Sequence, residues 1–176
     1  VRYTPLASLS PEIARRTITL FAPSKTYNIP GLGASFAVVP DATLRRRFER
    51  AMAGIVPHIN VLGYTGMVAA YTQGVPWRDA VVRYLRDNRD HLVRAIRGIP
   101  GLSMHSPEAT YLAWIDASGI ARPSGLTVAA FFEQAGLGLS AGQDFLPGGT
   151  DYVRLNFACT RKTLDLAISR LKAGCQ

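Results

Sequence analysis

Two side chains in this sequence have the chemistry of anchors for a small molecule, Lys25 and Arg154. Lys25 follows residues 17–22, whose β-branched and aromatic side chains predict a short buried strand. The lysine should therefore lie just past a strand end, where open α/β sheets place ligand chemistry. A partly buried lysine amine can lose its proton and form a Schiff base, which an arginine cannot do. A solvated loop lysine fits the same local pattern.

Arg154 lies in another candidate strand, residues 152–158. Alternation along this strand places apolar side chains on one face and directs Arg154 to the other. The planar guanidinium suits a carboxylate that is bound through two parallel hydrogen bonds. An exposed strand arginine in a surface ion pair fits equally, so the residue pattern leaves both interpretations open.

Four sequence motifs lie around these residues and follow one another along the chain. They are SLSPEIA at 8–14, PSKTYNIPGLG at 23–33, PEATYLAW at 107–114 and YVRLNF at 152–157. Together they resemble pyridoxal-phosphate enzymes of the class I/II aminotransferase fold, and within it the cystathionine β-lyase-like C–S lyases of the MalY/PatB group. Members of that group are considerably longer, so the resemblance implies that this chain is a C-terminal portion only.

The resemblance implies an α/β fold, that of a fold-type-I pyridoxal-phosphate-dependent transferase. Residues 1–75 are expected to be the C-terminal part of the large, cofactor-binding domain. Residues 76–176 are expected to form a small α+β C-terminal domain together with a linking helix. The resemblance further implies pyridoxal 5′-phosphate as cofactor, a homodimer, and a small amino-acid substrate in amino-acid metabolism.

The resemblance also assigns roles to individual residues. Lys25 is expected to be the catalytic lysine that holds the cofactor, with Ser24 as a second cofactor contact. Arg154 is expected to bind the substrate α-carboxylate. The Ser24 hydroxyl also fits simple turn capping. The chain departs from many fold relatives at Ala22, where they carry a phosphate-binding serine, and at Gly33, where they often carry an arginine.

The implied reaction is β-elimination on a cysteine-type amino acid such as cystathionine, which releases a thiol, pyruvate and ammonia. Transamination uses the same lysine and arginine, and no residue in the sequence separates the two reactions. A regulatory or binding protein that keeps the fold without turnover is the alternative from another class. We expect the chain to be inactive alone, because the 24 residues before Lys25 cannot supply both a carboxylate and a stacking ring for the cofactor.

Composition limits the remaining classes of partner. The net charge is +8, and its densest basic group, residues 45–50, fits either a phosphate backbone or the wet face of a helix. Because no aromatic residues interleave with these arginines, we predict no nucleic-acid partner. Cys159 and Cys175 are too few and too far apart for a disulfide framework or a zinc site, which favours a cytoplasmic setting and no metal. No apolar run is long enough to cross a membrane.

The hydrophobic pattern predicts the order of the elements. Predicted strands are 17–22, 35–39, 102–105, 110–116, 137–140 and 152–158, and predicted helices are 41–55, 65–73, 76–96, 127–135 and one that begins after Thr160. The Gly-rich segment 142–149 lacks the features of a P-loop and is interpreted as a mobile connection near the mouth of the site. We expect residues 76–176 to fold by themselves, and residues 1–75 to be poorly ordered alone or covered by a second copy.

Overall fold

The computed structural model describes residues 3–145 and 147–175. The chain forms two compact units, Val1–Ala80 and Val81–Gln176, which we call the first unit and the second unit. The division falls inside helix α5, Val75–Arg97. The long helix predicted over 76–96 is thus confirmed. The assignment of residues 1–75 to the large domain of the family stays a prediction.

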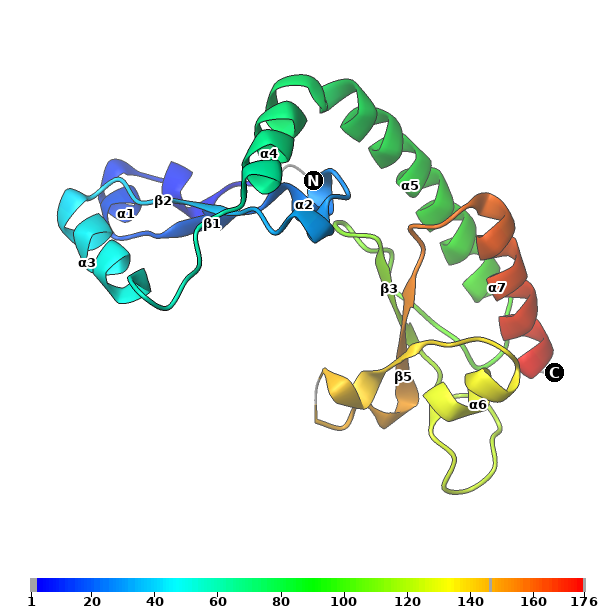
Figure 1. Ribbon diagram of the computed structural model, residues 1–176. Helices are drawn as coiled ribbons and strands as arrows, with labels where there is room; N and C mark the ends of the chain where they lie inside the picture. Colours follow the sequence, from blue (N-terminus) through cyan, green and yellow to red (C-terminus); the bar gives the residue numbers. More distant parts are fainter. Residues whose placement is uncertain (1–2, 146, 176) are drawn as a thin grey trace. The chain divides into compact units, whose positions relative to one another are not determined.

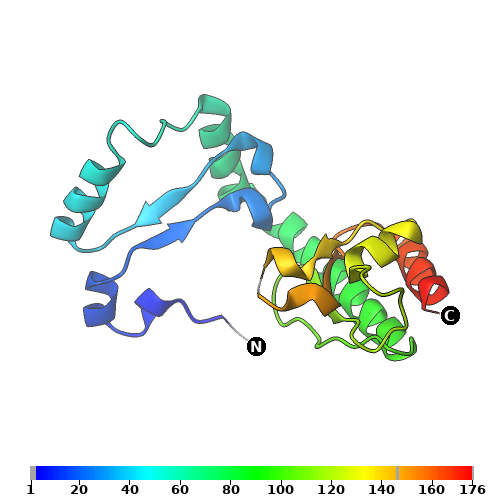
Figure 2. The same cartoon turned by 90° about the horizontal axis from the view of Figure 1, so that it is seen from below.

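The first unit consists of short elements around one antiparallel strand pair (Figure 2). Strand β1, Thr19–Phe21, pairs with β2, Phe36–Val38, and the rings of Phe21 and Phe36 stack with their centroids 5.2 Å apart. Both strands lie within the ranges predicted for them. The other elements are η1 (Leu6–Ser8), α1 (Pro11–Arg15), α2 (Pro23–Thr26), η2 (Pro30–Leu32), α3 (Ala42–Met52) and α4 (Val61–Gln73).

Side-chain caps determine where three helices of the first unit begin. Ser10, Asp41 and Asn60 each accept a hydrogen bond from the backbone N–H three residues further on. The Asn60 cap, with an oxygen–nitrogen distance of 2.7 Å, starts α4 at Val61. Helix α4 therefore begins four residues before the helix predicted over 65–73, because the Asn60 cap was not recognised in the sequence.

Few apolar side chains of the first unit are buried. Among its described residues, the buried hydrophobic ones are Tyr27, Ala34 and Val39. On the strand pair, by contrast, Leu20 is 70% exposed and Val38 is 45% exposed. Helix α4 is apolar on all sides, a composition typical of helices that are buried by neighbouring elements. The apolar faces that the sequence analysis expected to be exposed are thus present.

The second unit contains a three-stranded antiparallel sheet in the order β3-β5-β4 (Figure 1). Strand β3 is Leu112–Asp116, β4 is Ser140–Ala141 and β5 is Tyr152–Asn156. Three helices pack with it: α5, α6 (Val128–Gln134) and α7 (Arg161–Gly174). Thr160 caps α7 as predicted, and Thr127, which was predicted to be the first residue of its helix, caps α6. Two short 3-10 helices, η3 (Gly142–Asp144) and η4 (Gly149–Asp151), connect β4 to β5.

The two faces of this sheet differ in what they carry. One face contributes four buried side chains to a single hydrophobic core with residues of α5, α6 and α7; the four are Ala113, Ile115, Val153 and Leu155. The alternate residues of β3 and β5, which include Trp114, Tyr152 and Arg154, remain partly exposed on the opposite face. The alternation predicted for residues 152–158 is therefore confirmed, and it leaves Arg154 on the face away from the core.

Two predicted strands of the second unit are shorter than expected. Residues 102–105 form no strand, because only Ser103 exchanges backbone hydrogen bonds with Asp116, each 2.9 Å long. The strand predicted at 137–140 is reduced to Ser140–Ala141, which pair with the middle of β5. Local β propensity marked both segments, but pairing partners were available for only one or two residues of each.

Other features can be stated only for the residues that the structure describes. Within them, no helix is long and apolar enough to span a membrane. In the same ranges, no group of three histidine, cysteine or acidic side chains is placed to hold a metal ion. The arginines of α3 bond along their own helix or to the residues just before it, as when Arg45 donates to the Val39 carbonyl at 3.0 Å, which agrees with the interpretation of this group as helix surface.

Candidate functional site

Lys25 lies in a single helical turn directly after β1. Helix α2 begins with the buried Pro23 in its first position, and Lys25 is its third residue. The predicted location just past a strand end is thus correct, although the segment is a helical turn and not an open loop. The lysine is exposed, and no described side chain forms an ion pair with it. Its amine is therefore accessible to an aldehyde.

An aromatic contact fixes the end of this turn. Tyr27, the residue that ends α2, is buried and packs edge-on against Tyr71 of α4, with ring centroids 5.6 Å apart. Its ring also stacks on Trp77 of α5 at 6.5 Å. Burial, together with the charge of the neighbouring Tyr27, raises the pKa of the Tyr71 phenol, so this hydroxyl stays neutral. Lys25 therefore projects from a turn that the packed side chain of Tyr27 holds in place.

Close approach of α4 fixes the segment after the turn. A Cβ at Gly74 would lie 2.7 Å from the Tyr27 ring, and a Cβ at Gly63 would lie 2.5 Å from the Leu32 carbonyl oxygen. The same carbonyl accepts a hydrogen bond from the Asn60 amide at 3.2 Å. Because only hydrogen fits at the two glycines, the backbone that follows Lys25 lies directly on the helix.

Ser24 is half-buried beside Lys25 in α2. The backbone carbonyl of Ser24 accepts a hydrogen bond from the Ile29 N–H at 3.0 Å. Helix α2 has no side-chain cap, because its N-cap position is Ala22. The turn-capping role that the sequence left open for Ser24 is therefore not at this helix start, and its role toward a cofactor stays a prediction.

Arg154 lies on an aromatic surface in the second unit. On β5 it is opposite Trp114 of β3, and its guanidinium carbon lies 4.2 Å from the centre of the Phe145 ring. The Trp114 ring stacks on Tyr152, with centroids 5.7 Å apart. One guanidinium nitrogen donates to the Ser140 hydroxyl at 3.3 Å. The flat face of the Arg154 guanidinium therefore lies against the Phe145 ring.

No described carboxylate forms an ion pair with Arg154. A surface ion pair was the competing interpretation of this arginine, and the described residues do not supply one. The side chain is only half-buried, so its remaining N–H donors can reach a ligand. The arrangement fits a planar anion of carboxylate size.

The Gly-rich connection takes part in this site. Gly142 and Gly149 lie against each other, since a Cβ on Gly142 would be 2.4 Å from the Gly149 carbonyl oxygen. This contact closes the base of the connection between β4 and β5 and places Phe145 over Arg154. The interpretation of the segment as a simple mobile connection did not anticipate this contact, because a glycine pair gives no sign in sequence of which residues it brings together.

Backbone conformation marks one further position in each unit. Among the described residues, two non-glycine residues have left-handed backbone conformations, Asn28 with φ of 55° and Thr110 with φ of 68°. Asparagine tolerates this region, whereas a β-branched threonine is strained there. Thr110 lies just before β3, and both residues fall within the motifs PSKTYNIPGLG and PEATYLAW. The sequence analysis did not single out either conformation.

The described elements have the fold of the C-terminal part of fold-type-I pyridoxal-phosphate-dependent proteins, as comparison with known proteins shows. Residues 2–171 match the model of the family described as aminotransferase class I and II, so the chain belongs to that family. Its relatives include pyridoxal-phosphate-dependent lyases and aminotransferases, and the cofactor of the family is pyridoxal phosphate.

Two curated relatives have the names that the motifs suggested. Cystathionine β-lyase PatB of Bacillus subtilis is 33% identical over 98% of this chain and 45% of its own length. Protein MalY of Escherichia coli is 31% identical over 84% of this chain and 39% of its own length. The chain thus spans less than half the length of these relatives, and the resemblance to this group of C–S lyases is confirmed.

Solved structures show the same fold. The crystal structure of OvoB superposes with a TM-score of 0.92 and 48% identity, over all of this chain and 45% of that protein. A pyridoxal-phosphate-bound putative aminotransferase from Clostridium difficile has a TM-score of 0.90 and 33% identity, over 99% of this chain and 46% of that protein. The α/β, fold-type-I class predicted from the sequence is confirmed.

The residues of the chain fit the cofactor in kind. Pyridoxal phosphate has an aldehyde, and Lys25 offers an exposed primary amine on a turn whose following residues are packed. The hydroxyl of Ser24 is adjacent to it in the same turn. These two side chains are the ones in the described chain that would hold the group.

Proposed function

We propose that the complete protein is a pyridoxal-phosphate-dependent C–S β-lyase that acts on a cysteine-type amino acid such as cystathionine. The observation that carries the proposal is Lys25, an accessible amine on a packed turn after a strand, in a chain that belongs to this family. The names of its relatives cystathionine β-lyase PatB and cystathionine β-lyase of Corynebacterium glutamicum support a lyase over the other reactions of the family.

Each anchor has a defined task in this proposal. Lys25 would hold the cofactor through its amine, with Ser24 as a neighbouring contact, and once the substrate amine replaces it there, the Lys25 amine would accept the proton from the substrate Cα. The cofactor, when bound, would take up the electron pair that this deprotonation leaves on Cα. Arg154 binds the α-carboxylate and orients the substrate, so its contribution is positioning. The Cβ–S bond breaks with its electron pair on sulfur, and water completes the release of pyruvate and ammonia.

Aminotransfer is the second candidate, and the Clostridium difficile neighbour described as a putative aminotransferase favours it. A protein that keeps the fold without turnover is the third. The three are separated by one set of assays on the complete protein. A lyase forms thiol and pyruvate from cystathionine, a transaminase exchanges amino groups between amino and keto acids, and a binding protein does neither.

The role of Lys25 is tested by chemical trapping. Borohydride reduction of the complete, cofactor-loaded protein, followed by peptide mapping, should place the label on Lys25. The chain contains Lys162 and Lys172 as internal controls. A label on either of these two residues, with none on Lys25, would refute the assignment.

We further propose that the protein is a homodimer and that it resides in the cytoplasm. The exposed apolar side chains of β1, β2 and α4 support an assembly or a further part of the protein that covers them. Both cysteines are free thiols, which suits a reducing compartment. Analytical ultracentrifugation of the complete protein at several concentrations tests the dimer.

A further inference from the structure

The junction between β5 and α7 has buried backbone oxygens that the strand and the helix do not satisfy. Strand β5 ends at Asn156 and α7 begins at Arg161, so residues 157–160 belong to neither. Phe157 is buried and Cys159 is half-buried. Buried backbone carbonyls are nearly always paired, so these two positions need a donor from elsewhere in the fold.

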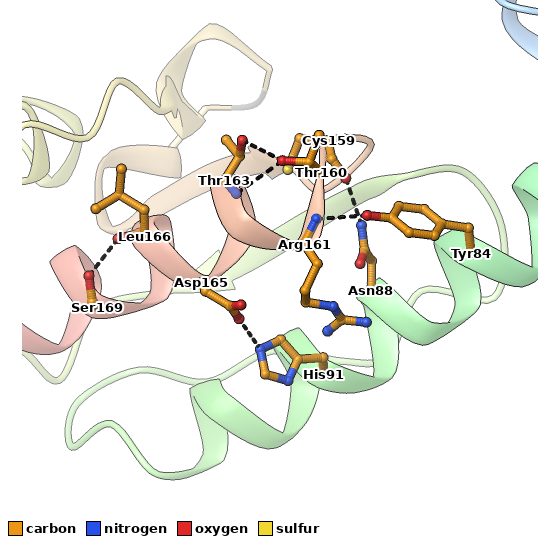
Figure 3. Close-up of polar contacts among 10 residues, drawn as sticks. All are labelled: Tyr84, Asn88, His91, Cys159, Thr160, Arg161, Thr163, Asp165, Leu166 and Ser169. Carbon is orange, nitrogen blue, oxygen red and sulfur yellow. Dashed lines mark hydrogen bonds and ion pairs between the residues drawn. The ribbon is translucent and has the colours of Figure 1, made fainter.

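Asn88 of α5 supplies that donor, although it is 69 and 71 residues away in sequence (Figure 3). Its side-chain nitrogen donates to the Phe157 carbonyl at 3.0 Å and to the Cys159 carbonyl at 2.9 Å. An amide NH₂ has two hydrogens, and both are used here. Asn88 is fully buried, and it is the one buried polar residue among the described core positions.

The orientation of this amide follows from its contacts. The Asn88 side-chain oxygen is buried and has no hydrogen-bond partner among the described residues. Exchange of the oxygen and nitrogen positions would set an acceptor against two carbonyl oxygens, so the amide has one allowed orientation. The side-chain oxygen stays unpaired, whereas the side-chain nitrogen donates two hydrogen bonds. This indicates that the two donated bonds determine the residue type.

Two further contacts flank Asn88 on the same face of α5 (Figure 3). One turn earlier, the Tyr84 hydroxyl accepts a hydrogen bond from the Arg161 backbone N–H at 2.7 Å. One turn later, His91 Nε2 lies 2.7 Å from an Asp165 carboxylate oxygen. Positions i, i+4 and i+7 share a helix face, so one face of α5 contacts the junction through Asn88 and the first turns of α7 through Tyr84 and His91.

We propose that Asn88 is a positioning residue for the carboxylate-binding Arg154, an inference that rests on the proposed function of Arg154. Arg154 lies on β5, three residues before Phe157, and Phe157 directly follows the end of the strand. Strand β3 pairs with the whole of β5, and Asn88 bonds the residues that directly follow the end of β5. Loss of the two donated bonds would let the junction shift and carry the guanidinium away from the substrate carboxylate.

The test uses the complete protein with Asn88→Leu, which keeps the size but removes both donors, and Asn88→Asp, which replaces donors by acceptors. We expect kcat/KM for the amino-acid substrate to fall by about tenfold to a hundredfold, mostly through KM. Amide hydrogen exchange at residues 155–160 should accelerate. The absorbance of the cofactor held by Lys25 should not change. Asn88→Ser, which cannot span both carbonyls, is the milder variant for use where the other two do not fold.

A matched control separates positioning from general stability. Leu171→Ala truncates a fully buried side chain of α7 that has no hydrogen-bonding group and so donates nothing to the carbonyls of residues 157–160. It should lower the unfolding midpoint and leave KM unchanged. An equal rise of KM in Leu171→Ala and in the Asn88 variants would overturn the proposal and leave Asn88 a structural residue.

The outcomes also distinguish this proposal from the function on which it rests. Faster exchange at 155–160 with an unchanged KM in the Asn88 variants would reject the positioning role alone, provided that Arg154→Lys still impairs the enzyme. Unchanged kinetics of Arg154→Lys would instead reject the carboxylate-binding role of Arg154, and the positioning role of Asn88 with it.

Discussion

The two units of this chain bury their apolar side chains to very different extents. In the second unit, sixteen buried hydrophobic residues from the sheet, three helices and the segments that connect them form one continuous cluster. In the described part of the first unit, the buried hydrophobic residues are Tyr27, Ala34 and Val39, and several side chains of β1, β2 and α4 are exposed. Since burial of apolar surface is the main source of folding free energy, the second unit has the means to fold alone and the first does not.

The two proposed anchors, Lys25 and Arg154, are divided between these units. Lys25 depends on a short turn that is held by one buried tyrosine and by glycine contacts with α4. Arg154 depends on the central strand of a packed sheet. The proposed carboxylate site therefore lies on a sheet that has its own buried core. The turn that carries Lys25 belongs to a unit whose apolar side chains need a further segment or chain to cover them.

The largest expected effect is obtained when the two parts are separated. A fragment of residues 76–176 should unfold cooperatively in urea, because its core is complete. A fragment of residues 1–75 should give no cooperative transition, because the strand pair has two open edges and exposed faces. Circular dichroism during urea titration measures both. A cooperative transition in residues 1–75 alone would show that the first unit has a core sufficient to fold by itself.

Single truncations should show the same contrast at a smaller scale. Phe132→Ala in the second unit removes a fully buried ring and should cost about 3–5 kcal/mol of unfolding free energy. Leu20→Ala in the first unit removes a side chain that is 70% exposed and should change stability by less than about 0.5 kcal/mol. A cost of several kcal/mol for Leu20→Ala would show that an apolar neighbour covers β1 in solution.

Arg154→Lys tests the proposed carboxylate-binding role of the anchor in the second unit. The substitution keeps the charge but loses the planar fork and its support on Phe145. We expect kcat/KM of the complete protein to fall by about tenfold to a thousandfold, which corresponds to one or two charge-assisted hydrogen bonds at about 1.5–3 kcal/mol each. Arg97→Lys, at an exposed position of α5, is the matched control and should leave kcat/KM unchanged.

The smallest expected effect concerns the two thiols, which lie in the second unit. Burial raises the pKa of Cys159 and of Cys175 above the usual value. Since the folded state then holds these protons more tightly, the associated stability is present below the unfolded thiol pKa and is lost as pH rises through the folded pKa. Alkylation of the native chain should therefore require a higher pH than alkylation in urea. Equal pH profiles in the two states would contradict this.

Several features of the protein were determined by the sequence alone. The caps at Ser10 and Asp41, the long helix over 76–96 and the position of Lys25 after a strand follow from patterns of a few neighbouring residues. The alternation along β5, which directs Arg154 away from the core, has a period of two residues and is equally local. The four motifs, read in order, also indicated the family.

The tertiary structure alone decided what surrounds these residues. Ser140 and Phe145 reach Arg154 across 14 and 9 positions of sequence, through a connection that closes on a glycine pair. Asn88 reaches the end of β5 across 69 positions, although in the sequence it is an ordinary polar residue of an amphipathic helix. Periodicity reports which face a side chain takes, but a contact between distant segments depends on how whole elements pack, and no local pattern encodes that.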